Sequence, residues 1–422
     1  MSAPDPEAAI AWLANQRRAM QSALATLVDI DSNSHDKAGT DRVAEAMRGW
    51  LLANDIEAEH RADPADGDVL LARLPGALPL ASPVVLMGHR DTVFPTGTVL
   101  QRPWHVEGDR GYGPGVADMK SGLVLQCFVL MALRRVAPLS FPVLGLFTAD
   151  EEIGSQRGRI AIEAHARGAR AAFNAEPGRV SGNLVTSRKG GANFVIDVTG
   201  RAAHAGMNHA DGASAIETLA RKIQALHALT DYAAGITTNV GLVSGGMSSN
   251  TVAPSAQGKL DVRFCTLAQR ETMFARIRDI VAEPGVAGTV ATVTQTSEFL
   301  PLEPKWSEDL LVRYQANAAR VGFAVEGEFT GGCSDAGFTA SLGIPTLCGV
   351  GPVGGKAHTE QEYCCLDTLV PRAQALLATI VGLFHSSRGV SGQIGRWSRC
   401  NCAFSYFQRF VMAECAVPEI VA

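Results

Sequence analysis

Three short apolar segments, each followed by a histidine or an acidic residue, constrain the fold of this chain most strongly. The segments are residues 83–87, 141–148 and 171–174. The residues that follow them are His89, Glu151, Glu152 and Glu176. Helical patterns at residues 122–135 and 157–167 separate the apolar segments, and alternating strands and helices predict a parallel sheet covered by helices. In such sheets the ligand site lies at the carboxyl ends of the strands, so we expect these side chains to meet there.

The character of the sequence changes near Ser187. Before it, residues 6–53 also have a helical, amphipathic pattern. After it, strand-like and helix-like patterns suggest a β-α-β-β-α-β-like order, typical of a small two-layer α+β insert. Those patterns cover residues 193–198, 213–229, 258–264, 270–281 and 288–294. After about residue 300 the alternation of helix and strand patterns seen in the first part of the chain returns, with a strand at 344–350 and a closing helix at 366–384.

The chain is therefore predicted to have two domains, the second inserted into the first. The predicted boundaries are 1–186 and 299–388 for the two parts of a catalytic domain, 187–298 for a lid or dimerisation domain, and 389–422 for a C-terminal extension of unknown role. The expected fold is α/β, with a mixed, mostly parallel sheet carrying helices on both faces. A length of 422 residues with 46% hydrophobic residues provides enough material for both domains.

The composition argues against several classes of protein. The formal net charge is -5 and no basic run occurs, which excludes a typical nucleic-acid-binding surface. No apolar run reaches the roughly 18 residues of a membrane span. The first residues are acidic where a secretory signal would be basic, so we expect a cytoplasmic protein. The 9 cysteines are odd in number and scattered, and we expect reduced thiols rather than a disulfide framework.

Two histidines and three carboxylates form a mixed nitrogen and oxygen ligand set that suits zinc or a similar divalent ion. The segments that supply them contain His89, Asp118, the pair Glu151 and Glu152, Glu176 and His358. A carboxylate such as Asp118, in a glycine-rich loop, can bridge two metal ions. Asp91, two residues after His89, points the same way from the strand and can accept the other ring N–H of the histidine.

Adjacent side chains diverge, so Glu151 and Glu152 are not expected to bind the same ion. One can be a ligand while the other meets a water molecule as a general base, with a pKa raised by burial among other acids. Among the remaining histidines, His204 is flanked by small residues after a predicted strand. Taken alone, His204 is better explained as a turn residue than as a functional one.

Seven sequence signals in the order of a known family make the chain resemble the M20 metallopeptidases, most closely the glutamate carboxypeptidase (carboxypeptidase G2-like) branch. They are GHRDTV, GPGVADMKSG, DEEIGS, EPG, GRAAHAG, DVRF and GGCSDA. The resemblance covers roughly residues 10–386. Each signal is weak alone, but the ordered series is specific.

The resemblance implies a ligand set for two Zn²⁺ ions, although Co²⁺ or Mn²⁺ could occupy the same ligands. One ion would be held by His89, Asp118 and Glu176, and the other by Asp118, Glu152 and His358. In the same family pattern Glu151 is the general base and Asp91 orients His89. The Asp118–Met119 bond would be a cis peptide.

The resemblance also assigns substrate-binding residues and an oligomeric state. The insert would form a homodimer, and His204 would reach the active site of the partner subunit and stabilise an oxyanion. Arg263 and Asn250, with Lys189 as a weaker candidate, would bind the carboxylate of the substrate. Some glutamate-specific relatives carry an arginine in the segment that returns from the insert. No basic residue occurs between Val281 and Pro304, which argues against a strict preference for glutamate.

The resulting hypothesis is a dinuclear zinc hydrolase that cleaves an amide bond beside a free carboxylate. Its substrates would be small peptides or N-acyl amino acids. An N-acyl-amino-acid deacylase or a dipeptidase of the same family is an alternative. A non-catalytic metal-binding subunit is another, against which the intact ligand set and Glu151 argue.

Overall fold

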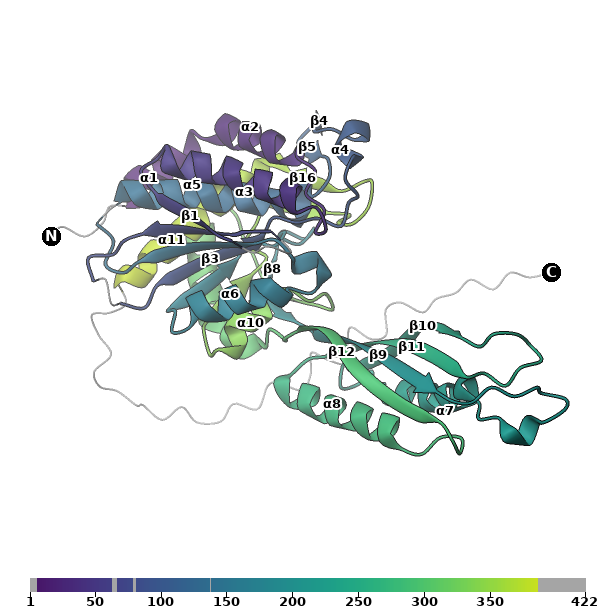
Figure 1. The fold of residues 1–422 in the computed structure, drawn as a ribbon. Coiled ribbons are helices and arrows are strands. Elements are labelled where there is room, and N and C mark those ends of the chain that lie inside the picture. The colour runs from purple at the N-terminus through teal and green to yellow at the C-terminus, as the bar shows by residue number, and fades with distance from the viewer. Residues whose placement is uncertain (1–5, 63–66, 79–80, 137, 386–422) are drawn as a thin grey trace, which may run out of the picture. The chain divides into compact units, whose positions relative to one another are not determined.

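The computed structural model describes residues 6–62, 67–78, 81–136 and 138–385 (Figure 1). The predicted extension at residues 389–422 lies outside this range. Residues 6–384 belong to one compact unit that contains three sheets.

The largest sheet has eight strands in the order β1-β2-β6-β3-β7-β14-β8-β13. Their bounds are Glu57–Arg61 (β1), Val69–Leu74 (β2), Val84–His89 (β3), Val143–Thr148 (β6), Ala171–Asn174 (β7), Leu184–Arg188 (β8), Gly327–Thr330 (β13) and Thr346–Cys348 (β14). The central strands β6, β3, β7 and β14 are parallel, whereas β1, β2 and the β14–β8 pair are antiparallel. The predicted mixed, mostly parallel sheet is confirmed. Strands β3 and β6 are buried along their whole length, which explains their continuous apolar sequence.

Helices cover both faces of this sheet (Figure 1). One face carries α1 (Pro6–Ala14), α2 (Arg17–Val28), α3 (Lys37–Leu52), α5 (Ser121–Val136), α9 (Glu308–Arg320) and α11 (Leu369–His385). The other carries α6 (Gln156–Ala166) and α10 (Ala336–Ser341), which pack on Val85, Met87 and Leu146. A short helix, α4, spans Thr98–Gln101.

Two helical stretches, Val116–Val136 and Leu366–Phe384, are long and apolar enough to cross a membrane by length and composition alone. In the most apolar window of each, 94% and 67% of the residues are buried within the protein. Both are accounted for as core helices of the large domain. Gly122 allows α5 to approach the sheet closely, because a Cβ atom there would lie 1.9 Å from the carbonyl oxygen of Ala175.

The helical pattern of residues 6–53 is divided into three helices rather than one. The second break, after α2, ends at Asp36, whose carboxylate caps α3 by accepting the N–H of Gly39. Within this break, Ser34 is buried and donates a hydrogen bond of 2.7 Å to Asp91. The interruption therefore brings a polar side chain to the end of β3.

The predicted insert is present as a second, four-stranded antiparallel sheet in the order β10-β11-β9-β12. Its elements are β9 (Gly190–Thr199), α7 (Ala215–His227), β10 (Thr237–Gly245), β11 (Ser255–Phe264), α8 (Leu267–Ala282) and β12 (Val290–Phe299). Both helices pack on this sheet through one apolar cluster. Because β8 remains in the large sheet as far as Arg188, the small sheet begins at Gly190.

A third sheet, in the order β15-β16-β5-β4, was not expected from the sequence. Its strands are β4 (His105–Glu107), β5 (Arg110–Tyr112), β15 (Gly354–Gly355) and β16 (Tyr363–Cys365). The pairing of β16 with β5 brings the loop that contains His358 beside the loop that contains Asp118.

Candidate active site

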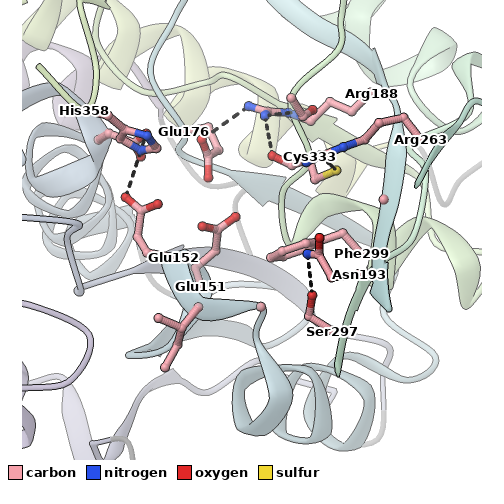
Figure 2. Close-up of a pocket in the computed structure, with 15 residues that line it drawn as sticks. Glu151, Glu152, Glu176, Arg188, Asn193, Arg263, Ser297, Phe299, Cys333 and His358 are labelled. Atoms are coloured by element: carbon pink, nitrogen blue, oxygen red, sulfur yellow. Dashed lines mark hydrogen bonds and ion pairs between the residues drawn. The ribbon is translucent and has the colours of Figure 1, made fainter. Parts of the chain in front are cut away.

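The five residues predicted as metal ligands meet at the carboxyl end of the large sheet. His89 is the last residue of β3, Glu152 lies in the turn after β6, and Glu176 follows β7 by two residues. Asp118 lies in a helical turn before α5, and His358 in the loop between β15 and β16. Glu152, Glu176 and His358 face one cavity together with Glu151 (Figure 2).

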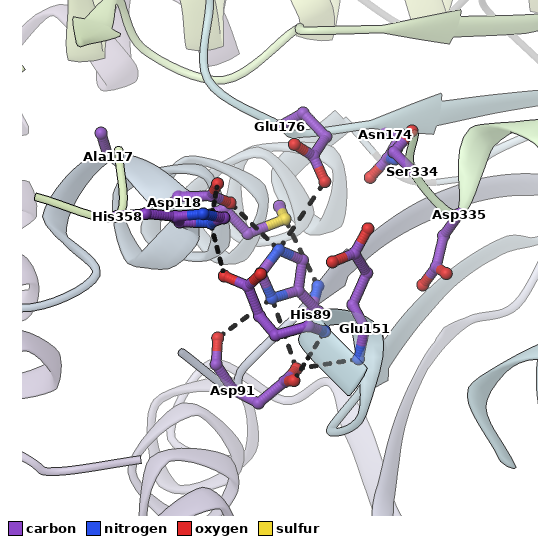
Figure 3. A network of polar contacts seen from close by, with 12 residues as sticks. His89, Asp91, Ala117, Asp118, Glu151, Asn174, Glu176, Ser334, Asp335 and His358 are labelled. Carbon is purple, nitrogen blue, oxygen red and sulfur yellow. Dashed lines mark hydrogen bonds and ion pairs between the residues drawn. The ribbon is translucent and has the colours of Figure 1, made fainter. Parts of the chain in front are cut away.

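The two oxygens of Asp118 face two different histidines (Figure 3). Oδ1 lies 3.1 Å from Nε2 of His89, and Oδ2 lies 3.4 Å from Nε2 of His358. His89 Nε2 is also 3.7 Å from Glu176 Oε1, while His358 Nε2 is 3.1 Å from Glu152 Oε1. The side chains thus fall into two groups that share Asp118, the same division that the sequence resemblance implies.

These distances fit a pair of divalent ions. Two ligand atoms bound at zinc distances in a tetrahedral arrangement lie about 3.3 Å apart, close to the separations within each group. The ligand atoms of His89, Asp118 and Glu152 all lie within 4.8 Å of one another. The Asp118–Met119 peptide is cis, as the resemblance predicts.

The electrostatics of the cluster favour additional positive charge. Burial, and then the nearby charge of Asp118, raises the pKa of Glu176 to about 7. Hydrogen bonds to Asp118 and Glu152 raise the pKa of His358 to about 10. Burial opposes protonation of His89, yet its bonds to Asp118 and Asp91 raise its pKa well above the usual value. Against the effect of burial, hydrogen bonds to His358 and His89 lower the pKa of Asp118, so its carboxylate stays charged between two histidines that take up protons. A divalent cation would satisfy the same group.

Asp91 supports both His89 and the turn that carries the two glutamates. Nδ1 of His89 lies 3.0 Å from the backbone oxygen of Asp91 and 3.3 Å from its Oδ1. The same carboxylate accepts the backbone N–H groups of Glu151 and Glu152 at 3.2 and 3.0 Å. Asp91 is fully buried, so these bonds are shielded from water. Its position fits the orienting role predicted for it and extends that role to Glu151.

Glu151 differs from its neighbour Glu152 because its carboxylate is not paired with a histidine of the ligand cluster. Within the described residues its carboxylate makes no hydrogen bond, whereas that of Glu152 bonds to His358. Glu151 lines the cavity and is buried. Burial raises its pKa well above the usual value, against the charge of His89 and with that of Glu176. A free carboxylate with a raised pKa, beside a ligand cluster, is suited to accept and return a proton.

The cavity, of about 440 Å³, continues from the ligand cluster to β9, β11 and β12 of the insert. This part is lined by two arginines, Arg188 and Arg263 (Figure 2). Arg188 lies 3.3 Å from Glu176 and donates to the backbone oxygen of Cys333 at 2.8 Å. Arg263 forms two parallel bonds to Asp261, of 2.9 and 2.8 Å, and its Nη1 lies 2.8 Å from the thiol of Cys333.

Asp91 is buried beside His89 and does not line this cavity, and three further predicted residues, His204, Asn250 and Lys189, do not line it either. His204 and Asn250 lie in neighbouring loops of the insert, where the N–H of Ala205 donates to the backbone oxygen of Asn250 at 2.9 Å. Both side chains are exposed. The side chain of Lys189 lies near Gly235 instead of pointing into the cavity. Of the three residues predicted to bind the substrate carboxylate, only Arg263 is at the cavity.

Two buried residues at the site were missed by the sequence analysis. Arg188 ends β8, and its position at the carboxyl end of a strand would have been the signal, but β8 was not predicted. Asp335 follows Cys333 in the GGCSDA segment and accepts hydrogen bonds from Ser155 and from Thr148. Burial raises the pKa of Asp335 to about 7. Its carboxyl group holds the turn after β6 from the side opposite Asp91 (Figure 3).

Comparison with curated proteins finds relatives named as a carboxypeptidase and as a desuccinylase. The chain is 25% identical over 375 residues to carboxypeptidase G2 of Pseudomonas sp. (strain RS-16), covering 87% of this chain and 89% of that protein. It is 30% identical over 316 residues to succinyl-diaminopimelate desuccinylase of Gluconobacter oxydans, covering 70% and 80% respectively.

Solved structures share the fold. The M20 family metallo-carboxypeptidase Sso-CP2 of Sulfolobus solfataricus superposes with a TM-score of 0.70 at 18% identity, covering 86% of this chain and 99% of that one. The aminopeptidase PepT of Bacillus cereus gives a TM-score of 0.70 at 22% identity, covering 86% and 98%. The model of peptidase family M20/M25/M40 matches residues 85–381, which include all five ligand-type residues and the whole insert. The chain therefore belongs to peptidase family M20/M25/M40 and is a hydrolase of that family.

Proposed function

We propose that this protein is a dinuclear zinc hydrolase that cleaves an amide bond beside a free carboxylate and releases an amino acid from a small peptide or an N-acyl amino acid. The observation that carries the proposal is the arrangement around Asp118, whose two oxygens face His89 and His358 separately. Two groups of nitrogen and oxygen ligands that share one carboxylate are the pattern of a two-metal hydrolytic site.

His89, Asp118 and Glu176 would hold one ion, and Asp118, Glu152 and His358 the other. Two divalent ions bound there would polarise the scissile carbonyl and lower the pKa of a water molecule. Glu151 takes the proton of the attacking water and delivers it to the leaving amine. Asp91 keeps the turn of Glu151 in place through its backbone hydrogen bonds.

The arginines on the insert side of the cavity would bind the carboxylate of the released amino acid. Arg263 uses three of its five N–H donors on Asp261 and Cys333, and two remain for the substrate. Arg188 adds a second positive charge, partly neutralised by Glu176. A carboxylate at this end of the cavity places the adjacent amide bond toward the ligand cluster, which gives the substrate its direction.

The cavity gives a reason to expect amino acids other than glutamate as the released product. The strand β12 contributes Ser297 and Phe299 to its wall, and neither carries a charge. An acidic side chain would have to share Arg188 or Arg263 with the substrate's own carboxylate. Deacylation of N-acyl amino acids with uncharged side chains is therefore the second candidate function, and Phe299 is the residue that favours it.

We also propose a homodimer formed through the insert. Strand β10 is an edge of the small sheet, and Leu242 and Val243 are exposed on it after an irregularity in its pairing between Val240 and Leu242. An exposed edge with apolar side chains favours pairing with a second chain. His204 and Asn250 share one exposed region of the same domain, away from the cavity of their own chain, which supports a role in the active site of the partner.

The proposal is tested by measuring hydrolysis of a panel of C-terminal peptide and N-acyl conjugates, glutamate included, by metal-free and zinc-reloaded protein. Zinc-dependent release of an amino acid is the expected result. Release of glutamate in preference to uncharged amino acids would contradict the second candidate. Absence of hydrolysis on the whole panel, with zinc bound, would overturn the proposed activity.

A further inference from the structure

The glutamate that follows the His358 loop, Glu362, makes an unusual contact with the chain around Asp118. It is 1% exposed and lies immediately before β16. Its Oε1 accepts two successive backbone N–H groups, that of Ala117 at 2.8 Å and that of Asp118 at 3.0 Å. The oxygen is thus occupied by backbone donors, and Glu362 is not available there as a ligand.

These two hydrogen bonds fix the backbone from which the Asp118 side chain projects. They hold the peptide between Ala117 and Asp118, and so set the direction of the Cα–Cβ bond of Asp118. The contact joins positions separated by about 245 residues. The loop at the other end of the contact carries His358, four residues before Glu362. One side chain therefore couples the backbone of Asp118 to the loop of its partner His358, whose Nε2 lies 3.4 Å from Asp118 Oδ2.

The same segment is held from two other directions. Gly354 of β15 lies against Ala117, so closely that a Cβ atom at residue 354 would be 2.7 Å from the Cβ of Ala117. Lys120 is fully buried and its ammonium group donates to the backbone oxygen of Ile30 at 2.8 Å. Packing and Lys120 restrain the segment as a whole, whereas only Glu362 among the described side chains bonds to the N–H of Asp118 itself.

We infer that Glu362 is a positioning residue for the metal centre: it sets the orientation of the shared ligand Asp118 relative to His358 and thereby the affinity for both ions. The inference rests on the proposed two-metal site and adds to it a residue that touches no ion. Residues that orient ligands typically change metal affinity by about 10–100-fold when they are replaced. Because Asp118 contributes to both ligand groups, loss of the two hydrogen bonds to Glu362 weakens the binding of both ions rather than of one.

The test compares Glu362→Gln with Glu360→Gln, an exposed acid two residues earlier in the same loop. Glutamine keeps the size of the side chain but offers the two backbone N–H groups a neutral amide oxygen in place of the carboxyl group. Affinity for Zn²⁺ is measured by competition with a chromogenic chelator, and the visible spectrum of Co²⁺-loaded protein reports the ligand geometry. We expect affinity to fall by about 10–100-fold at both sites in Glu362→Gln, with a changed Co²⁺ spectrum and no change in Glu360→Gln.

The thermal stability of each metal-free protein separates positioning from a merely structural role. A loss of stability in Glu362→Gln with unchanged zinc affinity and spectrum would overturn the inference. If Glu362→Gln changes neither the stability nor the zinc affinity, Glu362→Ala, which removes both bonds, must lower the zinc affinity, or the inference fails. If the unaltered protein itself binds no Zn²⁺, Co²⁺ or Mn²⁺, the proposed metal site is wrong as well as the inference. That outcome differs from a loss of affinity in the Glu362 variants alone.

Discussion

Glu151 and Glu152 are neighbours with opposite surroundings, and the difference predicts the effect of replacing Glu151. Glu152 is bonded to His358, whereas Glu151 faces the cavity with a free carboxylate. We expect Glu151→Gln to lower kcat by about 10²–10⁴-fold, the usual contribution of a general base. The amide keeps the shape of the site, so the metal content should not change. Elemental analysis beside steady-state kinetics checks this, and a variant with full metal and full kcat would remove Glu151 from the mechanism.

The raised pKa of Asp335 leads us to expect that the stability of the metal-free protein depends on pH. Burial raises its pKa to about 7 in the folded state, against about 3.9 in the unfolded chain. The folded state therefore binds the proton more tightly. The stabilisation that protonated Asp335 contributes to the folded state is complete below about pH 4 and is lost as the pH rises through about 7. Over that range the unfolding free energy falls by up to about 1.4 kcal/mol per pH unit.

Asp335→Asn should remove this dependence, because an amide mimics the protonated acid and can still bond to Ser155 and Thr148. Relative to the unaltered protein, the variant should gain roughly 1–3 kcal/mol in unfolding free energy between pH 5 and pH 7. Denaturant unfolding of both metal-free proteins across that range measures the difference. Equal slopes for the two proteins would show that Asp335 does not carry the proton.

Four of the ligand-type residues, His89, Asp118, Glu152 and Glu176, could be predicted because each stands in a short segment with its own pattern at a strand end or glycine-rich loop, whereas His358 was assigned through the family resemblance. Arg188, Asp335 and Glu362 could not. Their roles come from contacts with groups far away in the sequence: Glu176 and Cys333 for Arg188, Ser155 for Asp335, and two backbone N–H groups for Glu362. The strand-end position of Arg188 and the GGCSDA segment of Asp335 do not by themselves reveal these distant partners.

At the scale of elements, Glu298 of β12 joins the insert to the large domain. It lies between Arg270 of α8 and Arg159 of α6, with a distance of 2.9 Å to the latter. The side chain of Glu298 is buried, so its bonds are protected from water. This triad connects the strand that returns from the insert to a helix that packs on the large sheet.

Glu298→Gln should loosen that connection and lower the unfolding free energy by roughly 1–3 kcal/mol, because it leaves two arginines without their shared acid. Hydrogen exchange should increase in β12 and α8. Glu163→Gln is the matched control, since Glu163 is half-buried and pairs with the same Arg159 within α6, four residues along the helix, and its loss should cost about 0.3–0.5 kcal/mol. Equal effects of the two variants would mean that the triad adds nothing beyond a surface pair.

The elements that the sequence predicted best are those buried on both faces, such as β3 and β6, where an unbroken apolar run is required. The missed strands lack that requirement. β4 is three residues long and exposed throughout, and β10 places apolar side chains on its exposed side. These strands form because they pair with neighbouring strands, β4 with β5 and β10 with β11. Such pairing cannot be predicted from the sequence of one segment alone.

At the scale of the whole molecule, one chain contains every residue of the proposed two-metal site and the carboxylate-binding arginines. His204 and Asn250 are the exceptions, exposed on the insert and absent from the cavity lining. Either they serve no function at the active site, or they serve it in a second copy. A symmetric dimer through β10 would allow each chain to supply these residues to its partner.

Complementation between two inactive variants distinguishes these possibilities. Glu151→Gln lacks the base but keeps His204, and His204→Ala keeps the base. If His204 acts in the partner's site, each mixed dimer has one complete site, so co-expression in equal amounts should restore about a quarter of the unaltered activity. His209→Ala, in the same exposed loop, is the control and should be active alone. Light scattering must show a dimer, and a dimer without recovery would place His204 outside the partner's active site.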